Sequence, residues 1–90
     1  MIVKDVVVQN RMGLHARPSA MIVKEATKFN SVVVLKTNDD KANCKSILEV
    51  LLLAAERGTE MKLIVEGDDE NEAANRIEVL FLKNFHEKNE

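Results

Sequence analysis

The sequence predicts an α+β domain in which an antiparallel sheet is covered by helices on one face. Residues 2–8 are rich in Val and Ile, as strands are, and residues 61–66 alternate apolar and polar side chains, which is the period of a half-buried strand. Residues 32–44 fit a hairpin, and three further segments carry apolar residues at helical spacing. The resulting order is β-α-β-β-α-β-α, which packs as a two-layer fold. The strand order stays open, because a ferredoxin-like fold has nearly the same sequence of elements.

The first strand and the first helix are separated by a short loop. The strand, residues 2–8, is rich in Val and Ile, and the five residues after it break the pattern and end in Gly13. A helix follows His15 and runs to about Lys28. Pro18 belongs in its first turn, where a missing N–H costs little.

A hairpin comes next. Val32 to Thr37 has the composition of a strand, and Asn38-Asp39-Asp40 is a turn signal. Lys41 to Cys44 is long enough for a short third strand, so the two strands are expected to pair.

The second helix is predicted from a capping box. Ser46 can accept from the N3 amide and Glu49 can reach back, so the helix should start at Ile47 and stop near Arg57, before Gly58. Apolar residues surround it almost completely. One stripe contains Ile47, Val50, Leu51 and Ala54, and a second contains Leu48, Leu52 and Ala55. One helix on a small domain rarely buries both stripes, so the second is expected to stay exposed.

The last strand, residues 61–66, shows the cleanest alternation in the chain. A turn follows it at Gly67, and Asp69 with Glu72 can cap the final helix. The apolar residues of that helix are Ala73, Ala74, Ile77, Leu80, Phe81 and Phe85. The tail, 86–90, is polar and is expected to fray.

Length and composition indicate a single small globular domain, residues 1–90. The chain is 46% hydrophobic and 31% charged, and its net charge of -2 with only three Phe argues against a nucleic-acid partner. Cys44 stands alone, which excludes a disulfide framework and indicates a reducing, cytoplasmic compartment. Lys4 and Asp5 interrupt the first apolar residues, so we expect no signal peptide, and no apolar run could cross a membrane.

No metal and no cofactor are expected. A single cysteine cannot build a cysteine metal site. The acidic run Asp68-Asp69-Glu70 lacks the spaced ligands of a calcium site and fits helix capping better. His86 fits a solvated residue of the tail.

The stretch Gly13-Leu14-His15-Ala16-Arg17-Pro18-Ser19 places an imidazole beside a guanidinium, immediately before a helical pattern. A helix N-terminus offers unpaired N–H groups and a partial positive charge, which favour an anion. Arg17 adds a fixed cation that binds phosphate through two donors. The residues alone therefore predict a histidine placed where a phosphate can lie.

Two motifs carry a resemblance to a known family. The stretch Gly13-Leu14-His15-Ala16-Arg17-Pro18 resembles the active-site signature of HPr, the histidine-containing phosphocarrier of the bacterial phosphotransferase system. Lys45-Ser46-Ile47 resembles the second motif of that family, which surrounds a regulatory serine. Because the length and the element order match as well, the resemblance covers nearly the whole chain.

The resemblance implies the HPr open-faced sandwich, with four antiparallel strands and three helices on one face. His15 would accept a phosphoryl group on its ring Nδ1 from phosphorylated enzyme I, which draws on phosphoenolpyruvate. It would pass that group to a histidine of an enzyme IIA protein or domain, and Arg17 would stabilise the phosphate. The protein would be a monomeric carrier and not an enzyme, because its partners supply the Mg²⁺ and the rest of the positioning.

Ser46 has two interpretations, and both stay open. It can be an N-cap, which is worth about 1 kcal/mol. The resemblance instead implies a phosphorylation site for an HPr kinase/phosphorylase. A phosphate there would add negative charge to the surface on which enzyme I is expected to dock, and it would weaken the binding of enzyme I.

If the protein is a phosphocarrier, the exposed stripe of the second helix is expected to be a docking site, because exposed apolar patches commonly mark such sites. We expect a patch near His15 to bind enzyme I and the acceptors. The predicted docking residues are Ala16, Ala20, Ile47, Leu48 and Leu52.

Two residues depart from the family pattern. Ser19 stands where the family usually has Ala, and its hydroxyl could reach the phosphate or cap the helix. Glu49 stands where sugar-transport members carry Gly or Lys. The stretch Leu51-Leu52-Leu53-Ala54-Ala55-Glu56-Arg57-Gly58 is more similar to the nitrogen-related branch, NPr, which regulates and does not feed sugar permeases. The branch stays open.

Two other functions are compatible with the residues. One is a regulatory binding module whose phosphorylation state only sets its choice of partner. The other is a ferredoxin-like domain that binds a small molecule and is never phosphorylated.

Overall fold

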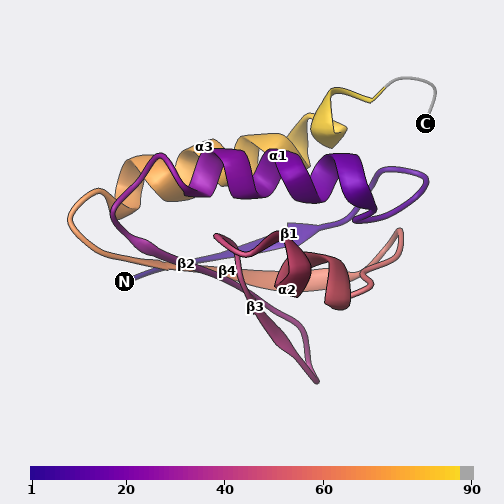
Figure 1. The fold of residues 1–90 in the computed structure, drawn as a ribbon, viewed down its shortest axis with the longest axis horizontal. Coiled ribbons are helices and arrows are strands. Elements are labelled where there is room, and N and C mark those ends of the chain that lie inside the picture. Colours follow the sequence, from indigo (N-terminus) through magenta and orange to yellow (C-terminus); the bar gives the residue numbers. More distant parts are fainter. Residues whose placement is uncertain (88–90) are drawn as a thin grey trace.

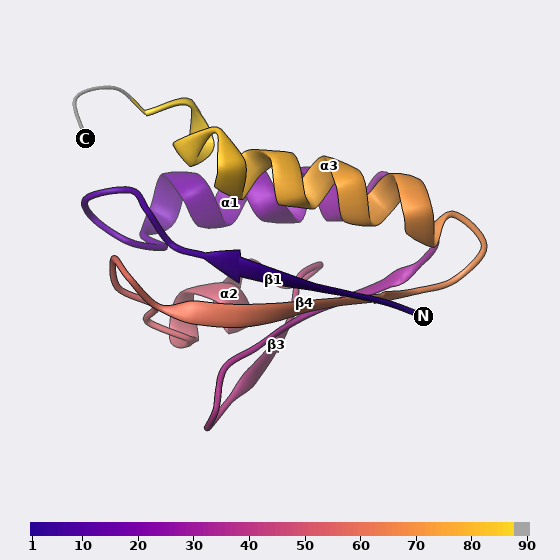
Figure 2. The same ribbon diagram turned by 180° about the vertical axis from the view of Figure 1, so that it is seen from behind.

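The computed structural model describes residues 1–87 and has the predicted order of elements. The elements are β1 (Ile2–Val7), α1 (Ala16–Ala26), β2 (Val32–Lys36), β3 (Lys41–Asn43), α2 (Ile47–Leu52), β4 (Glu60–Glu66), α3 (Glu70–Leu82) and the 3-10 turn η1 (Asn84–His86). The helix α1 and the long helix α3 lie side by side across one face of the sheet in both views (Figures 1 and 2). The α+β class is confirmed.

The four strands form one antiparallel sheet in the order β1-β4-β2-β3. The strand β4 pairs with β1 on one side and with β2 on the other, so the two strands joined by α1 are separated by the last strand. In a ferredoxin-like sheet the third strand would take that place. The strand order thus resolves the ambiguity that the element order left and excludes the ferredoxin-like alternative.

The core lies between the sheet and the helices, and the sequence periods account for it. Strand residues of one parity are buried, and those of the other parity form an open face. The buried inward-facing strand residues include Val6, Val33, Leu35, Met61, Leu63 and Val65. Every apolar residue predicted for the last helix is buried, and the ring of Phe85 meets that of Phe81 edge-on, with centroids 5.0 Å apart.

The helix α2 is shorter than predicted. It was expected to reach Arg57, but it ends at Leu52, and Ala54 adopts a left-handed φ of 50°. The helix ends there because backbone groups of the following residues form hydrogen bonds with other segments of the chain. The Ala55 carbonyl accepts a hydrogen bond from Leu14 N–H at 2.9 Å, and Gly58 N–H donates to the Val8 carbonyl at 2.7 Å. A continuing helix would bring neither group to its partner.

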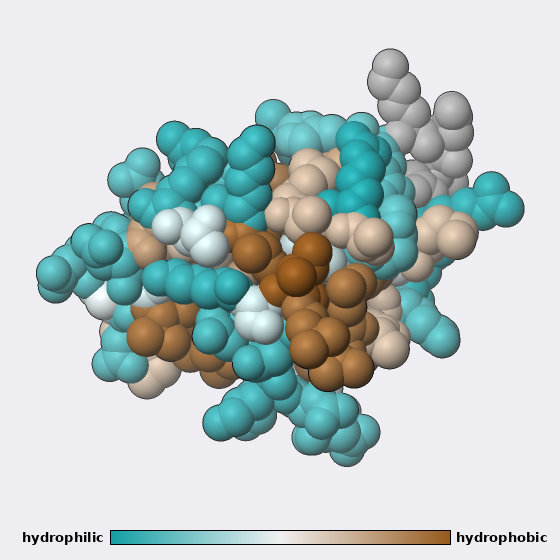
Figure 3. Space-filling model, viewed as in Figure 1, coloured by the Kyte–Doolittle hydropathy of each residue, from teal (hydrophilic) through white to brown (hydrophobic). Residues whose placement is uncertain are grey.

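The shortening changes which residues of α2 are buried. Val50 alone is buried within the helix, while Ala55, predicted for the exposed stripe, is 6% exposed. Residues of both predicted stripes therefore remain on the surface, and they form a hydrophobic area over α2 (Figure 3). We call this area the α2 patch, and it consists of Ile47, Leu48, Leu51 and Leu52.

The predicted cap of α3 is wrong in its detail. The side chain of Asp69 makes no capping bond. Its carboxylate accepts hydrogen bonds from Asn30 N–H at 2.9 Å, from Ser31 N–H at 3.0 Å and from the Ser31 hydroxyl. Asp69 therefore ties the start of α3 to the segment that leads into β2.

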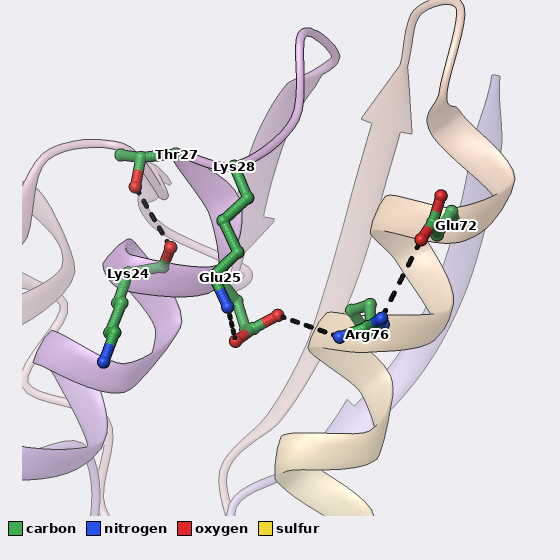
Figure 4. Close-up of polar contacts among 6 residues, drawn as sticks. All are labelled: Lys24, Glu25, Thr27, Lys28, Glu72 and Arg76. Carbon is green, nitrogen blue, oxygen red and sulfur yellow. Dashed lines mark hydrogen bonds and ion pairs between the residues drawn. The ribbon is translucent and has the colours of Figure 1, made fainter.

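A surface network joins α1 to α3 (Figure 4). Lys28 Nζ lies 2.9 Å from Glu25 Oε2, and an Arg76 nitrogen lies 3.8 Å from Glu25 Oε1, which is an ion pair without a hydrogen bond. A second Arg76 nitrogen is 3.9 Å from Glu72. Exposed pairs of this kind contribute about 0–1 kcal/mol each, so the helices are held mainly by their buried faces.

Asp69 gives the fold a predictable acid dependence. Hydrogen bonds from Ser31 and Asn30 lower the pKa of its carboxyl below the ordinary value. A group with a lowered folded pKa stabilises the native state fully above the unfolded pKa, and that contribution is lost as the pH falls through the folded pKa. We expect Asp69→Asn to reduce the free energy of unfolding at neutral pH and to have progressively less effect in acid.

Urea unfolding of the wild type and of Asp69→Asn between about pH 6 and pH 2 measures this difference. Asp68→Asn is the matched control, because it removes a neighbouring exposed carboxylate that accepts none of these bonds. A difference between wild type and Asp69→Asn that stays constant with pH would contradict the assignment.

Candidate functional site

The loop between β1 and α1 is a closed turn held by a buried asparagine. Gly13 N–H donates to the Asn10 carbonyl at 3.1 Å, and Asn10 Nδ2 donates back to the Gly13 carbonyl at 2.6 Å. Asn10 is fully buried, so its side chain replaces the water that the loop carbonyl would otherwise bind. The turn fixes the backbone two residues before His15.

Gly13 lets this loop pack against the segment after α2. Its φ is +72°, and a Cβ there would lie 2.4 Å from the Ala55 carbonyl oxygen. The next residue, Leu14, donates its N–H to that same oxygen and buries its side chain in the core. Only glycine fits, because both the left-handed backbone and the close approach exclude a side chain.

His15 is the N-cap residue of α1. Its backbone is extended, its carbonyl accepts the first helical hydrogen bond from Ser19 N–H at 3.1 Å, and its side chain makes no capping bond. The imidazole is thus not used in capping the helix, and it is 38% exposed. Pro18 occupies the third helical position and is buried, as the sequence predicts for the first turn.

The first turn of α1 retains the features of an anion site. Within residues 1–87, no hydrogen bond uses the N–H of Ala16 or of Arg17. The turn has no acidic residue, and the Arg17 side chain is exposed. Of the arginines in this part of the chain, Arg76 alone forms an ion pair, so the Arg17 guanidinium is available to a ligand.

Ser19 does neither of the things expected of its hydroxyl. It is fully buried, and its Oγ donates to the Leu14 carbonyl at 3.1 Å. The hydroxyl thus reinforces the turn that leads into the helix, and it is not directed at a phosphate on His15.

Glu87 is a site residue that the sequence reasoning missed, because the tail was expected to fray. Its Oε2 lies 3.3 Å from His15 Nε2, and its side chain is 13% exposed. No spacing signal could have found this pair, because the residues lie at opposite ends of the chain. The remainder of the predicted tail, 88–90, lies outside the described residues.

Ser46 is the N-cap of α2, as predicted, and half of the capping box is present. Its Oγ accepts from Glu49 N–H at 3.3 Å. The reciprocal bond is absent from the described residues, because Glu49 Oε1 accepts from Asn43 N–H at 2.9 Å and Ser46 N–H donates to the Asn43 carbonyl. The Glu49 carboxylate therefore lies at the start of α2, near the serine.

All five predicted docking residues are exposed. In the α2 patch, Leu48 and Leu52 are 63% and 70% exposed, and Ile47 is less so. Ala16 and Ala20 lie on the surface of α1, which contacts α2, and Figure 3 shows paler apolar atoms continuing upward from the α2 patch toward α1. The structure thus places the predicted surface on the two helices whose ends meet the His15 loop.

The described part of the chain contains no cluster of three His, Cys, Asp or Glu side chains that could hold a metal ion. Cys44 is buried in the core, and burial raises the pKa of its thiol to about 12, so it does not supply a thiolate. No helix over residues 1–87 has the length and hydrophobicity needed to span a membrane.

The chain is similar to known proteins over nearly its whole length. The family model described as PTS HPr component phosphorylation site matches residues 2–83. The phosphocarrier protein HPr of Treponema pallidum is 47% identical over 88 residues, which cover 98% of this chain and all of that protein.

Two solved structures are similar over nearly their whole length. HPr from Thermoanaerobacter tengcongensis superposes with a TM-score of 0.94 at 37% identity, covering 99% of this chain and all of that one. Crh from Bacillus subtilis, described as a catabolite repression protein and a swapped dimer, gives a TM-score of 0.74 at 39% identity, covering 93% and 97% of the two chains.

Proposed function

The chain belongs to the HPr family of the phosphotransferase system, and we propose that it carries a phosphoryl group on His15. Phosphorylated enzyme I would deliver the group, and a histidine of an enzyme IIA protein or domain would receive it. In the transfer, the lone pair of His15 Nδ1 forms a bond to phosphorus while the bond from phosphorus to the donor breaks. This chemistry belongs in the cytoplasm, where phosphoenolpyruvate is available.

One observation carries the proposal. His15 is the N-cap of α1 and its ring is 38% exposed, and within residues 1–87 the N–H groups of Ala16 and Arg17 make no hydrogen bond and the Arg17 side chain makes no ion pair. A helix end stabilises an anion by about 0.3–1 kcal/mol, and a charge-assisted hydrogen bond by roughly 1.5–3 kcal/mol. Both contributions are modest, which suits a phosphate that must leave again. The protein is therefore a carrier without turnover of its own, and its partners supply Mg²⁺.

We propose that the α2 patch, with Ala16 and Ala20, binds enzyme I and the acceptors. Support comes from the exposure of these side chains and from the hydrogen bond between Leu14 and Ala55, which joins the His15 loop to the end of α2. A partner seated on the α2 patch would thus lie against the helix end that bears His15. Burying two exposed leucines is worth about 1.5–3 kcal/mol each before the costs of association.

We propose that phosphorylation of Ser46 by an HPr kinase/phosphorylase weakens this docking. A phosphate at the N-terminus of α2 would add negative charge beside the α2 patch, where Glu49 already contributes a carboxylate. The simple N-cap interpretation of Ser46 is compatible with the same geometry, so the effect of charge has to be measured separately from the cap.

A regulatory role is the second candidate function, and the relative described as a catabolite repression protein favours it. Such a protein would be phosphorylated but would not feed sugar transport, as in the nitrogen-related branch. We propose that the chain acts as a monomer in either role.

His15→Ala is expected to abolish phosphorylation. Incubation with enzyme I, Mg²⁺ and phosphoenolpyruvate should give the wild type an acid-labile, alkali-stable phosphate. His86→Ala, the matched control at the other histidine, should retain it. Arg17→Ala should slow transfer roughly ten- to hundredfold through loss of one charge-assisted contact. Phosphate retained in His15→Ala would contradict the proposal.

A separate measurement, onward transfer to a sugar-specific enzyme IIA, would distinguish the carrier role from the regulatory role.

Leu48→Asp is expected to raise the KM of enzyme I for this protein about tenfold or more, with little change in kcat. A charge on the α2 patch should oppose docking without touching the phosphoryl group. Leu82→Asp is the matched control, because Leu82 is a similarly exposed leucine on α3. Equal KM values for the two variants would rule out docking at the α2 patch.

The variants Ser46→Asp and Ser46→Asn distinguish the effect of a negative charge at this position from the effect of losing the N-cap. Asp and Asn are both good N-cap residues, so the two variants should unfold with free energies within about 1 kcal/mol of each other. Only Ser46→Asp should transfer phosphate from enzyme I more slowly, because only it adds charge beside the α2 patch. Indistinguishable transfer rates would refute electrostatic regulation at this position.

A further inference from the structure

The contact between His15 and Glu87 is built into the fold. Glu87 follows η1, in which Asn84, Phe85 and His86 all have left-handed φ values of 53–59°. Each such residue costs about 1–2 kcal/mol, so the turn needs compensation. Full burial of Phe85 against Phe81 offsets part of this cost, and Glu87 N–H donates to the Asn84 carbonyl at 3.0 Å. Glu87 is thereby placed beside His15 at the N-terminus of α1.

The chemistry of the pair is directional. A neutral imidazole carries its proton on one ring nitrogen only, and an ionised carboxylate can only accept a hydrogen bond. Glu87 Oε2 lies 3.3 Å from Nε2, so the contact requires the proton on Nε2. The lone pair is then on Nδ1, the nitrogen that phosphoryl transfer uses.

We propose that Glu87 is a positioning residue that holds His15 in the tautomer with Nε2 protonated, so that Nδ1 is the nucleophile. This inference rests on the proposed function of His15. During transfer the Nδ1 lone pair forms the bond to phosphorus, and the electron pair of the breaking bond leaves with the donor. No proton has to move, because the Nε2 proton stays in place.

The same contact stabilises the phosphorylated ring. Once Nδ1 is bonded to phosphorus and Nε2 keeps its proton, the imidazole ring gains positive charge. The Glu87 carboxylate faces that charge from the Nε2 side, while Arg17, exposed in the first turn of α1, is available to the phosphoryl group. Opposite charges close to a charged form favour it. Glu87 and Arg17 therefore act on different parts of the same phosphohistidine.

The test compares Glu87→Ala, Glu87→Gln and Glu66→Ala. Glutamine keeps an acceptor oxygen without the charge, and Glu66→Ala removes an equal charge from the exposed end of β4. The ring ¹⁵N chemical shifts of His15, recorded in the unphosphorylated protein at a pH where the ring is neutral, report the tautomer ratio. We expect the wild type, Glu87→Gln and Glu66→Ala to show a larger share of the Nε2-protonated form than histidine in an unstructured peptide, in which that form already predominates. Glu87→Ala should fall back to the ratio of the unstructured peptide.

Transfer from enzyme I provides the second measurement. We expect Glu87→Ala to be slower by about three- to tenfold, Glu87→Gln to be intermediate, and Glu66→Ala to match the wild type. A wild-type tautomer ratio and a wild-type rate in Glu87→Ala would overturn the inference. Its failure is distinguishable from failure of the proposed function, because the tautomer is measured without phosphate, whereas a wild type that is never phosphorylated on His15 overturns the carrier role itself.

Discussion

The hydrogen bond from Leu14 N–H to the Ala55 carbonyl is the contact on which the site depends. It joins the loop before α1 to the segment after α2, and it forms only because Gly13 has no side chain to strike the same oxygen. It adds to the packing of α1 against α2 by tying the residue before His15 directly to the segment after α2. The N-terminal end of α1, where we propose that the phosphoryl group is carried, is thereby held next to the end of α2.

The other features of the site are individually weak. Within residues 1–87, the proposed phosphate site consists of two N–H groups without a hydrogen-bond partner, an exposed guanidinium and a partly exposed imidazole, and these groups do not enclose it. An open site of this kind allows the group to be handed on, because a partner can approach the phosphorus directly. Glu87 adds a carboxylate on the Nε2 side of the ring, away from Nδ1, the nitrogen that we propose accepts the phosphoryl group.

Features set by local periodicity were predictable from sequence, and those set by distant contacts were not. The alternation in residues 61–66 and the Pro18 position correctly predicted β4 and the start of α1. The length of α2 was wrong, because residues after Leu52 have helix-forming side chains, yet their backbone is used by Leu14 and Val8. Asp69 was predicted as a cap and instead binds Ser31, which lies far away in sequence. Glu87 follows three residues with left-handed backbone, and no sequence pattern predicts that conformation there.

The central claim is that the phosphoryl group is bonded to His15 Nδ1. The most direct measurement is ³¹P–¹⁵N coupling in protein labelled with ¹⁵N in its imidazole rings and phosphorylated by enzyme I and phosphoenolpyruvate. We predict a one-bond coupling to Nδ1 of His15, with Nε2 still protonated. Coupling to Nε2, coupling to His86, or a phosphate without any coupling to ring nitrogen would contradict this account.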